Sequence, residues 1–554
     1  TAYQLGTVES LDNLVVIQIE RIKAEKSRSS ITKELFKFLE NIGYAKALIV
    51  TFSKEETHYR LSYIKSDLDG VSETRVKRKF SNPKRLSFLL GEDQRIHTPT
   101  KQLIKLGKIK NLADLFSRFN IEIVNDEFFE NYKKLFVNLQ NKIEKDSIFN
   151  KFLKDKNITS DFFSKRLLGQ IVFCYFLQKK RWLGVNKEKR FGAGDQNYLR
   201  NTFNFYNDKK KNFFNEFLEF FFYEGLNKLN DNNFVKNINV KVPYIGGGLF
   251  EYFEGYDWKN ETLNIPNSFF SNVNKDGILD IFDLYNFTVD EYEDYDIELA
   301  VDPEMLGRVF ENLLPENIRK GGGSYYTPRI IVNYMCENSL SQFLYKKFQN
   351  TLSLEKIGNF IKNRNFNISQ EKTFISNADE IDKALRDLRI CDPSIGSGAF
   401  AVGIVNLISR LRFLLINHVS RKYKNNLYFF KRDCIQNSIY GVDIDSSAVE
   451  IAKLRLWLTL IVEKDNYEDT EPLPNLDFQL IQGNSLIDEV DGFNFQHLDV
   501  KNKDYQFELL PNDVWDEFSK TKEKFIDLKK KYLDLKIFKK KKFSEKKSKL
   551  CCLK

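Results

Sequence analysis

With 554 residues, 42% of them hydrophobic, the chain can bury large cores, and at roughly 100 to 200 residues per domain we expect about three or four domains. The net charge of +9 is weak evidence for nucleic-acid binding, because residues 520–554 carry 15 Lys against 4 acids (+11) and the remainder carries 71 basic against 73 acidic residues (−2). The six cysteines form no Cys-x-x-Cys pair and the four histidines are scattered, which predicts no metal site and no disulfide framework. The sequence has no signal-peptide pattern and no run of about 18 apolar residues, which predicts a cytoplasmic protein with no membrane segment.

Residues 1–100 have the pattern of a small α/β module. The segments 14–19 and 47–52 are rich in β-branched and apolar residues, and a helical pattern lies between them. A nuclease centre of the PD-(D/E)xK type needs an acid on one strand and an acid-x-Lys on the next to hold a metal ion. Asp12 is followed by Gln18-Ile19-Glu20 with no such lysine, so the pattern does not favour a working nuclease centre.

Residues 101–315 are predicted to form a helical domain rich in aromatic residues. The apolar periodicity predicts helices over 103–116, 126–143, 162–182 and 212–224. In the last of these, five phenylalanines recur at helical spacing on one face, and we interpret them as core packing rather than a base-stacking platform: Phe213, Phe214, Phe217, Phe220 and Phe221. The acidic, aromatic run 280–302 is interpreted as a connection between helices.

Two further helices are predicted before the most informative stretch. The first covers 305–314 and leads to three consecutive glycines, Gly321 to Gly323. The second covers 330–343, and Thr327 followed by Pro328 is typical of an N-cap with proline at the first helical position.

The chain is organised around residues 388–400, Leu-Arg-Ile-Cys-Asp-Pro-Ser-Ile-Gly-Ser-Gly-Ala-Phe. An apolar run reaches Asp392, a turn contains Gly396 and Gly398, and an apolar periodic segment follows, which predicts a strand, a tight turn and a helix. Glycine lets backbone pass close to a ligand, and the helix start offers free N–H groups. A nucleotide-type cofactor loop and an ordinary strand-to-helix turn both fit this stretch by itself.

Two later stretches repeat the pattern of a strand that ends in polar residues. Residues 438–460 contain a strand ending at Asp443, then Asp445 or Ser446 as a cap, then a helix; residues 475–486 contain a strand that ends at Gly483-Asn484-Ser485. An acid at the end of the strand after a glycine loop is where doubly wound folds hold a ribose. A nicotinamide site requires that acid about 20 residues on, whereas Asp443 lies 51 positions after Asp392.

Together these stretches resemble the consecutive S-adenosylmethionine motifs of adenine-specific (N6) DNA methyltransferases, in particular the large bacterial type IIG restriction-modification enzymes. The segments that carry the resemblance are GSYYTP at 323–328, DPSIGSGAF at 392–400, GVDID at 441–445 and QGNSL at 482–486. The resemblance implies an α/β fold: an incomplete, Rossmann-like S-adenosylmethionine-dependent methyltransferase at 316–500, after the helical domain and the N-terminal module, and followed by a basic, helical or disordered tail at 501–554.

The resemblance also implies a role for each motif. Asp392 would accept a hydrogen bond from the methionine ammonium group, and Asp443 would hold the ribose hydroxyls. The backbone of the turn that contains Ser394, Gly396 and Gly398 would run close past the cofactor. Three further roles follow: Tyr326 and Thr327 would cover the methionine carboxylate, Ile444 would pack on the adenine face, and Asn484 would sit at the adenine amino edge. Many relatives have Asp where Asn484 stands; an amide oxygen still accepts a hydrogen bond but lacks the charge.

Adenine methylation in this family depends on an Asn or Asp followed by Pro-Pro and an aromatic residue, which receives the flipped base. The only Asn-Pro, Asn82-Pro83, is followed by Lys84. We therefore expect no catalytic residue in this chain and a truncation before that motif. Three hypotheses stay open: an inactive fragment of a DNA methyltransferase, the cofactor-binding subunit of a split enzyme completed by a second polypeptide, and a non-catalytic remnant that binds double-stranded DNA.

Overall fold

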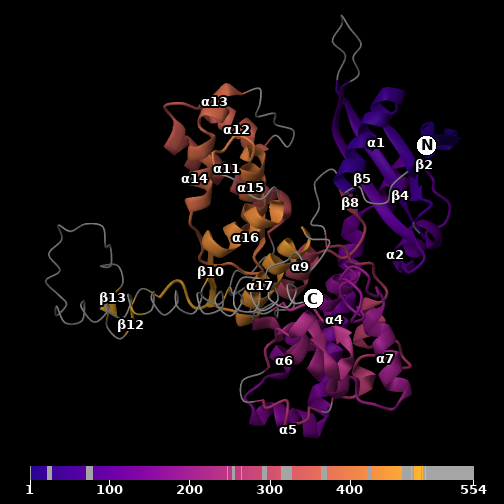
Figure 1. Ribbon diagram of the computed structural model, residues 1–554. Coiled ribbons are helices and arrows are strands. Elements are labelled where there is room, and N and C mark those ends of the chain that lie inside the picture. The colour runs from indigo at the N-terminus through magenta and orange to yellow at the C-terminus, as the bar shows by residue number, and fades with distance from the viewer. Residues whose placement is uncertain are drawn as a thin grey trace, which may run out of the picture. The chain divides into compact units, whose positions relative to one another are not determined.

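The computed structural model describes residues 2–21, 28–55, 57–69, 79–245, 248–252, 256–263, 265–289, 296–312, 327–362, 371–421, 426–463, 476, 479–487, 489–490, 493–494 and 524 (Figure 1). The chain divides into two compact units, Thr1–Ser485 and Leu486–Lys554. Of the second unit the structure describes the short antiparallel pair β12 (Glu489–Val490) and β13 (Phe493–Asn494). The predicted basic tail, apart from Lys524, lies outside the described residues.

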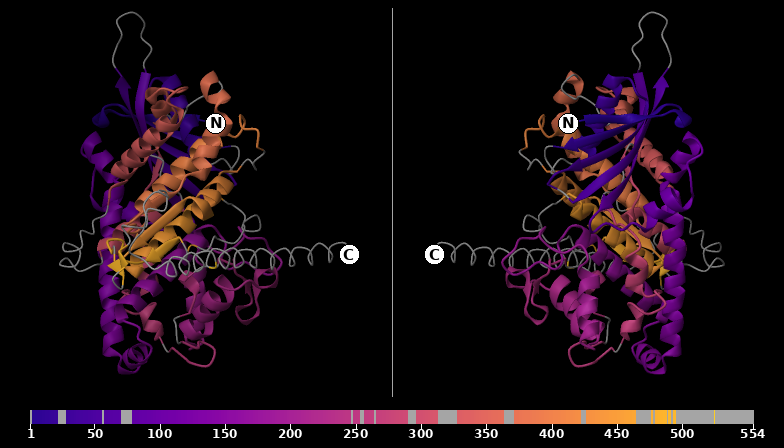
Figure 2. Two further views of the ribbon diagram at one scale, coloured as in Figure 1. Left: turned by 90° about the vertical axis from the view of Figure 1, so that its left-hand side faces the viewer. Right: turned by 90° about the vertical axis from the view of Figure 1, so that its right-hand side faces the viewer.

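The N-terminal part forms a six-stranded sheet in the order β1-β2-β3-β4-β5-β8, whose twist is visible in Figure 2. Its first five strands are β1 (Ala2–Val8), β2 (Leu14–Arg21), β3 (Lys46–Ser53), β4 (His58–Asp69) and β5 (Lys79–Gly91). β2 and β3 are parallel, and the other pairs among these five are antiparallel. Alternate residues of β3 are buried, as a half-covered strand requires. Helix α1 (Arg28–Ile42) packs Leu35 and Leu39 against this sheet.

The sixth strand corrects the interpretation of 280–302 as a connection between helices. Residues Asp296–Glu298 form β8, which pairs with β5 in parallel, Arg85 opposite Asp296. Arg85 is 1% exposed and lies 3.9 Å from the Asp296 carboxylate, while Arg60 Nη1 lies 3.0 Å from Glu298 Oε2. The two carboxylates point to one face of β8, and both meet arginines of the sheet. The sequence pattern missed this strand because its pairing depends on charges in distant strands.

The helical part packs around α4 (Ile121–Lys145) and α6 (Ser160–Lys179). The other helices are α2 (His97–Pro99), η2 (Thr100–Lys105), α3 (Leu112–Arg118), α5 (Ser147–Asp155), α7 (Tyr198–Asp208), η3 (Phe214–Leu218), η4 (Phe220–Leu226) and α8 (Ile278–Phe282). The predicted helix 103–116 is wrong as one element, because residues 106–111 separate η2 from α3. The phenylalanines at 213, 214, 217 and 221 are buried and that at 220 is partly buried, which confirms the core-packing interpretation.

Short elements complete this part of the chain. They are the antiparallel pair β6 (Phe234–Val235) and β7 (Val240–Lys241) and the 3₁₀ turns η1 (Glu9–Leu11), η5 (Asp231–Asn233), η6 (Lys236–Ile238), η7 (Gly248–Phe250) and η8 (Asn267–Phe269).

From residue 303 the chain builds a three-stranded parallel sheet in the order β11-β10-β9. Its strands are β9 (Ile390–Asp392), β10 (Ile439–Asp443) and β11 (Leu480–Gln482). Its helices are α9 (Pro303–Asn312), α11 (Arg329–Phe348), α12 (Leu354–Lys362), α13 (Lys372–Ser376), α14 (Ala378–Asp387), α15 (Ala399–Leu415), α16 (Leu427–Asn437) and α17 (Ser446–Ile461). This alternation of strands and helices is the mixed α/β arrangement that the sequence predicts.

The sequence predicts N-caps for two helices, and the structure agrees with one prediction and not with the other. Of the two caps predicted for α17, Asp445 and Ser446, the structure has Asp445, which accepts from the Ser447 N–H at 2.8 Å. Thr327 is not the N-cap of α11: that residue is Pro328, whose backbone is extended at ψ 142° and whose carbonyl accepts from Val332. In the part of the chain that the structure describes, we find no helix long and apolar enough to cross a membrane.

The Arg85 contacts generate a prediction about the N-terminal sheet. Arg85 also donates to Ser62 Oγ at 3.0 Å and Thr32 Oγ1 at 2.8 Å. Arg85→Met leaves the buried Asp296 without its arginine, so we expect a loss of about 3 kcal/mol in the free energy of unfolding, measured by urea denaturation. Lys54→Met, which breaks the solvent-exposed pair with Glu20, is the control and should change little. Equal effects of the two variants would contradict the importance of the buried pair.

Candidate functional site

The carboxyl ends of the three parallel strands bring the predicted site together. Gly441 of β10 lies opposite both Asp392 of β9 and Leu480 of β11, and Asp443 lies opposite Gln482. Asp392 and Asp443 are therefore the last residues of neighbouring strands, at one edge of the sheet. In open α/β sheets, ligands bind at this edge.

The turn after β9 needs its glycines. Gly396 and Gly398 have φ of 51° and 80°, a region that residues with a Cβ adopt reluctantly. A Cβ on Gly398 would lie 3.1 Å from the Cα of Ala452, so this glycine also lets the turn approach α17. Glycine at these positions follows from local backbone geometry and close packing.

Asp443 fixes this turn to the neighbouring strand. Its Oδ2 accepts from the Gly396 N–H at 2.8 Å, and its Oδ1 accepts from the Asp445 N–H at 3.0 Å. The Ile395 N–H also donates to the Val442 carbonyl at 2.9 Å. Each carboxylate oxygen has a second lone pair, so Asp443 retains acceptor capacity for a ligand.

Asp392 has an unsatisfied carboxylate oxygen. Its Oδ1 accepts from the Ser394 N–H at 3.1 Å, while its Oδ2 is buried and has no hydrogen-bond partner. Burial raises the pKa of Asp392; the Ser394 N–H opposes this, and the negative charge of Asp443 adds to it. A buried acceptor without a partner costs stability. A cationic donor at this edge would satisfy the oxygen and favour the ionised carboxylate.

The remaining predicted site residues differ in how closely the structure associates them with Asp392 and Asp443. Ile444 follows β10 and is 71% exposed, and Asn484 is an exposed residue after β11. Ser485 Oγ donates to the Pro393 carbonyl at 2.7 Å, which brings the turn after β11 to the loop after β9. Thr327 is half-buried before α11, and in the described part of the chain it makes no hydrogen bond with Asp392 or Asp443. Tyr326 lies outside the described residues.

A buried arginine that the sequence analysis did not single out supports the glycine turn from behind. Arg455, in the apolar helix α17, donates from Nη1 to the Ser397 carbonyl at 3.0 Å and to Ser397 Oγ at 3.2 Å. A Cβ on Gly307 of α9 would lie 2.7 Å from Arg455 Nη1, so α9 closes over the same contact. A charged residue between two leucines of a largely buried helix was the signal that could have revealed it.

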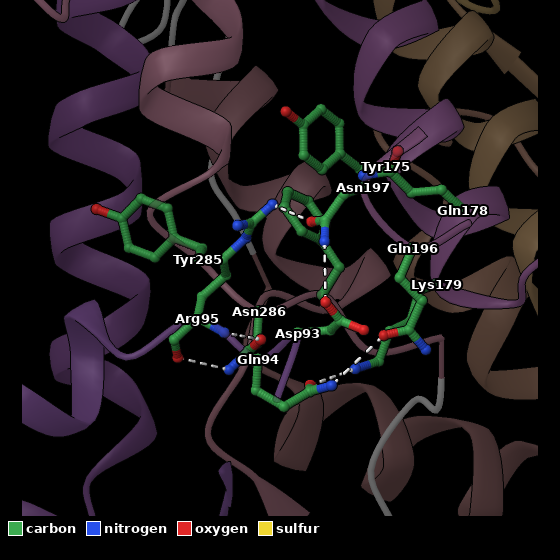
Figure 3. Close-up of a pocket in the computed structure, with 11 residues that line it drawn as sticks. Asp93, Gln94, Arg95, Tyr175, Gln178, Lys179, Gln196, Asn197, Tyr285 and Asn286 are labelled. Carbon is green, nitrogen blue, oxygen red and sulfur yellow. Dashed lines mark hydrogen bonds between the residues drawn. The ribbon is translucent and has the colours of Figure 1, made fainter. Parts of the chain in front are cut away.

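A small cavity between the N-terminal sheet and the helical part is a structural junction (Figure 3). Arg95 donates from its backbone N–H to Asn286 Oδ1 at 2.9 Å and from Nη2 to Asn197 Oδ1 at 2.5 Å. Gln94 Oε1 accepts from Lys179 Nζ at 3.2 Å. The cavity measures about 30 Å³, room for about one water molecule, so these side chains mainly bind one another.

A known family matches the part of the chain that begins just before β10. Residues 437–548 match the model of the Eco57I restriction-modification methylase family. The chain therefore carries an Eco57I-family restriction-modification methylase region. That region includes Asp443, Ile444 and Asn484, whereas the glycine turn lies before it.

Curated relatives extend the similarity upstream. The chain is 31% identical over 361 residues to the putative type II restriction enzyme and methyltransferase RM.MjaORFECS2P of Methanocaldococcus jannaschii, a match that covers 59% of this chain and 28% of the relative. It is 29% identical over 150 residues to the type II restriction enzyme and methyltransferase RM.Eco57I of Escherichia coli, covering 23% and 14%. The chain thus spans less than a third of the length of these relatives.

Two solved structures show weaker likeness. The type IIL restriction-modification enzyme MmeI in complex with DNA gives a TM-score of 0.40 at 15% identity, covering 65% of this chain and 40% of that one. The DrdV–DNA complex gives a TM-score of 0.28 at 12% identity, covering 84% and 33%.

The unsatisfied Asp392 oxygen generates a prediction about stability and pH. Because the pKa of Asp392 is raised in the folded state, its ionisation weakens folding as pH rises through that pKa. We expect Asp392→Asn to raise the thermal midpoint at pH 7, and the gain to shrink at acidic pH, where wild-type Asp392 is protonated. Scanning calorimetry at both pH values measures this, and a lower midpoint for the variant at pH 7 would contradict it.

Proposed function

We propose that this chain binds S-adenosylmethionine at the carboxyl edge of its parallel sheet and is the cofactor-binding part of a DNA adenine N6-methyltransferase of a type IIG restriction-modification enzyme. The methylase family region and the type II relatives support the general class. The adenine specificity, the cofactor and the individual site residues are part of the proposal, as is double-stranded DNA as the partner.

The observation that carries the proposal is the buried, unpartnered Oδ2 of Asp392 at the sheet edge. An α-ammonium group is a suitable partner, because a charge-assisted hydrogen bond satisfies the oxygen and offsets its desolvation. The residues present therefore fit the amino-acid end of the cofactor. We assign the binding of the ammonium group to Asp392, and we assign the backbone that runs close past the cofactor to the neighbouring turn of Ser394, Gly396 and Gly398.

The other end of the cofactor is assigned to the next two strands. Asp443 would accept from the ribose hydroxyls with the lone pairs that Gly396 and Asp445 leave unused. Ile444, exposed beyond β10, offers an apolar surface to the adenine ring, and Asn484 an amide to its amino edge. Tyr326 and Thr327 are assigned to the methionine carboxylate on the strength of the motif resemblance.

The cofactor supplies an activated methyl group on a sulfonium, and this chain's own residues hold it in place. Transfer to adenine also requires a residue set that extrudes the base and accepts hydrogen bonds from its amino group. The 554 residues contain no Asn or Asp followed by Pro-Pro and an aromatic residue. We therefore propose cofactor binding without methyl transfer for this chain by itself, with the catalytic motif supplied by a second polypeptide or by residues outside this sequence.

We also propose a division of labour along the chain. Residues 316–500 hold the cofactor, 101–315 form a helical domain, 1–100 an α/β module and 501–554 a basic tail. β8, at 296–298, adds one strand from beyond residue 100 to the N-terminal sheet. The local +11 charge of 520–554 suits sequence-independent contact with phosphates.

Two variants and two ligands test the site assignment. Asp392→Asn should weaken S-adenosylmethionine binding roughly 10- to 150-fold, the equivalent of a lost charged hydrogen bond of about 1.5–3 kcal/mol. It should leave 5′-methylthioadenosine, which lacks the amino-acid end, unaffected. Asp443→Asn should weaken both ligands. Isothermal titration calorimetry measures the affinity of the wild type and of both variants for each ligand.

The control for that experiment is Asp387→Asn, an exposed acid at the end of α14, near the opposite edge of the sheet. It should bind both ligands as the wild type does. Unchanged S-adenosylmethionine affinity in Asp392→Asn would show that the ammonium assignment is wrong, and equal losses for both ligands would move Asp392 to the nucleoside end.

A separate measurement tests the proposed lack of turnover. The purified chain, incubated with cofactor tritiated on the methyl group and genomic DNA, should incorporate no tritium into adenine above a sample without protein. The physical reason is that holding two reactants in a fixed geometry can account for about 7–11 kcal/mol of the reaction barrier, and a base that nothing positions lacks this contribution. Incorporation by the chain alone would contradict the proposal that the catalytic groups come from elsewhere.

A further inference from the structure

A cavity at the amino edge of the parallel sheet is lined by arginines. It measures about 250 Å³, and we call it the arginine pocket; its lining residues are Arg386, Arg412, Arg421, Phe429, Phe430, Arg432, Asp433 and Gln436. The arginines come from α14, α15, the segment after α15, and α16. Four guanidinium groups that converge from four segments of the chain are a concentration of positive charge in one cavity.

The topology separates this pocket from the candidate cofactor site. α14 ends at Asp387, just before β9 begins at Ile390, and α16 ends at Asn437, just before β10 begins at Ile439. Residues near these helix ends therefore lie at the amino edge of the sheet, whereas Asp392 and Asp443 end the same strands at the carboxyl edge. The arginine pocket thus lies at the edge of the sheet opposite the candidate cofactor site.

The charge balance of the lining is positive. Four arginines face one acid, Asp433, which already accepts from Arg412 Nη1 at 2.6 Å. Two further carboxylates pair with lining arginines, Asp382 with Arg412 at 2.8 Å and Asp387 with Arg386 at 3.1 Å. An anion in the cavity would therefore meet lining side chains that are mostly positively charged.

Arg412 has a structural role within this set. It is 2% exposed, joins α15 to α14 and α16 through Asp382 and Asp433, and lies with its guanidinium 5.0 Å from the centre of the Phe430 ring. Arg421 is exposed and Arg432 is half-buried, so these two side chains are better placed to meet an incoming ligand. Phe429, also half-buried, adds an apolar wall.

We propose that the arginine pocket binds a phosphate group carried by a small nucleotide-like molecule. Arginine recognises phosphate with paired hydrogen bonds from a planar fork, and it retains its charge at all physiological pH values. The apolar wall suits the ring of a nucleoside. The volume lies just below the roughly 300–1,000 Å³ of typical ligand sites, which favours a small phosphorylated molecule over a larger ligand.

Pyrophosphate is the probe for this site. We expect calorimetric titration of the whole chain at low ionic strength to show saturable binding, and Arg421→Gln and Arg432→Gln each to weaken it roughly tenfold or more. The matched control is Arg389→Gln, an exposed arginine between α14 and β9 that does not line the pocket; it should bind as the wild type does. Arg412 is left intact, and circular dichroism of each variant verifies folding.

Three results would overturn the proposal. One is the absence of saturable pyrophosphate binding by the wild type, and another is an equal loss in Arg389→Gln. The third concerns the source of the phosphate: a short DNA duplex that displaces pyrophosphate in a manner dependent on Arg421 and Arg432 would assign the pocket to the nucleic-acid backbone. Displacement by a nucleoside triphosphate but not by the duplex would support the small-ligand assignment.

Discussion

The hydrogen bond from the Gly396 N–H to the Asp443 carboxylate is the contact on which the candidate site depends. It joins residues 47 positions apart and fixes the turn after β9 to the end of β10 at 2.8 Å. Because Asp443 also accepts from Asp445, one carboxylate positions both the glycine turn and the start of α17. The same side chain that is assigned to a ribose therefore also organises the backbone around it, so its structural and binding roles are linked.

Behind this turn a buried arginine completes the support. Arg455 binds Ser397 from α17, and Gly307 allows α9 to approach so closely that a Cβ would clash with both side chains. The turn is thus bound both by the Asp443 carboxylate and by the Arg455 guanidinium. Such fixed surroundings favour ligand binding, because less conformational freedom is lost when the ligand enters.

Buried charge recurs throughout the first unit as a means of joining distant segments. Arg85 and Arg60 hold β8 to the N-terminal sheet, and Arg412 joins α14, α15 and α16. Charged groups are costly to bury without partners, so each of these contacts specifies one pairing among many that apolar packing alone would tolerate. The arginine pocket lies next to one of these junctions, at the edge of the sheet opposite the candidate cofactor site.

The sequence alone determined the local units: the strand, glycine turn and helix at 388–415, the acids that end β9 and β10, a cap of α17 at Asp445 or Ser446, and the buried phenylalanine stripe. Each depends on spacing within about ten residues, where periodicity and turn chemistry are directly readable. Only the tertiary structure decided the pairing of β8 with β5, the contact of Ser485 with Pro393 across 92 positions, the Arg455 support and the gathering of the four arginines. These contacts join segments far apart in the chain, and an alternation of polar and apolar residues specifies that a face is buried without specifying what covers it.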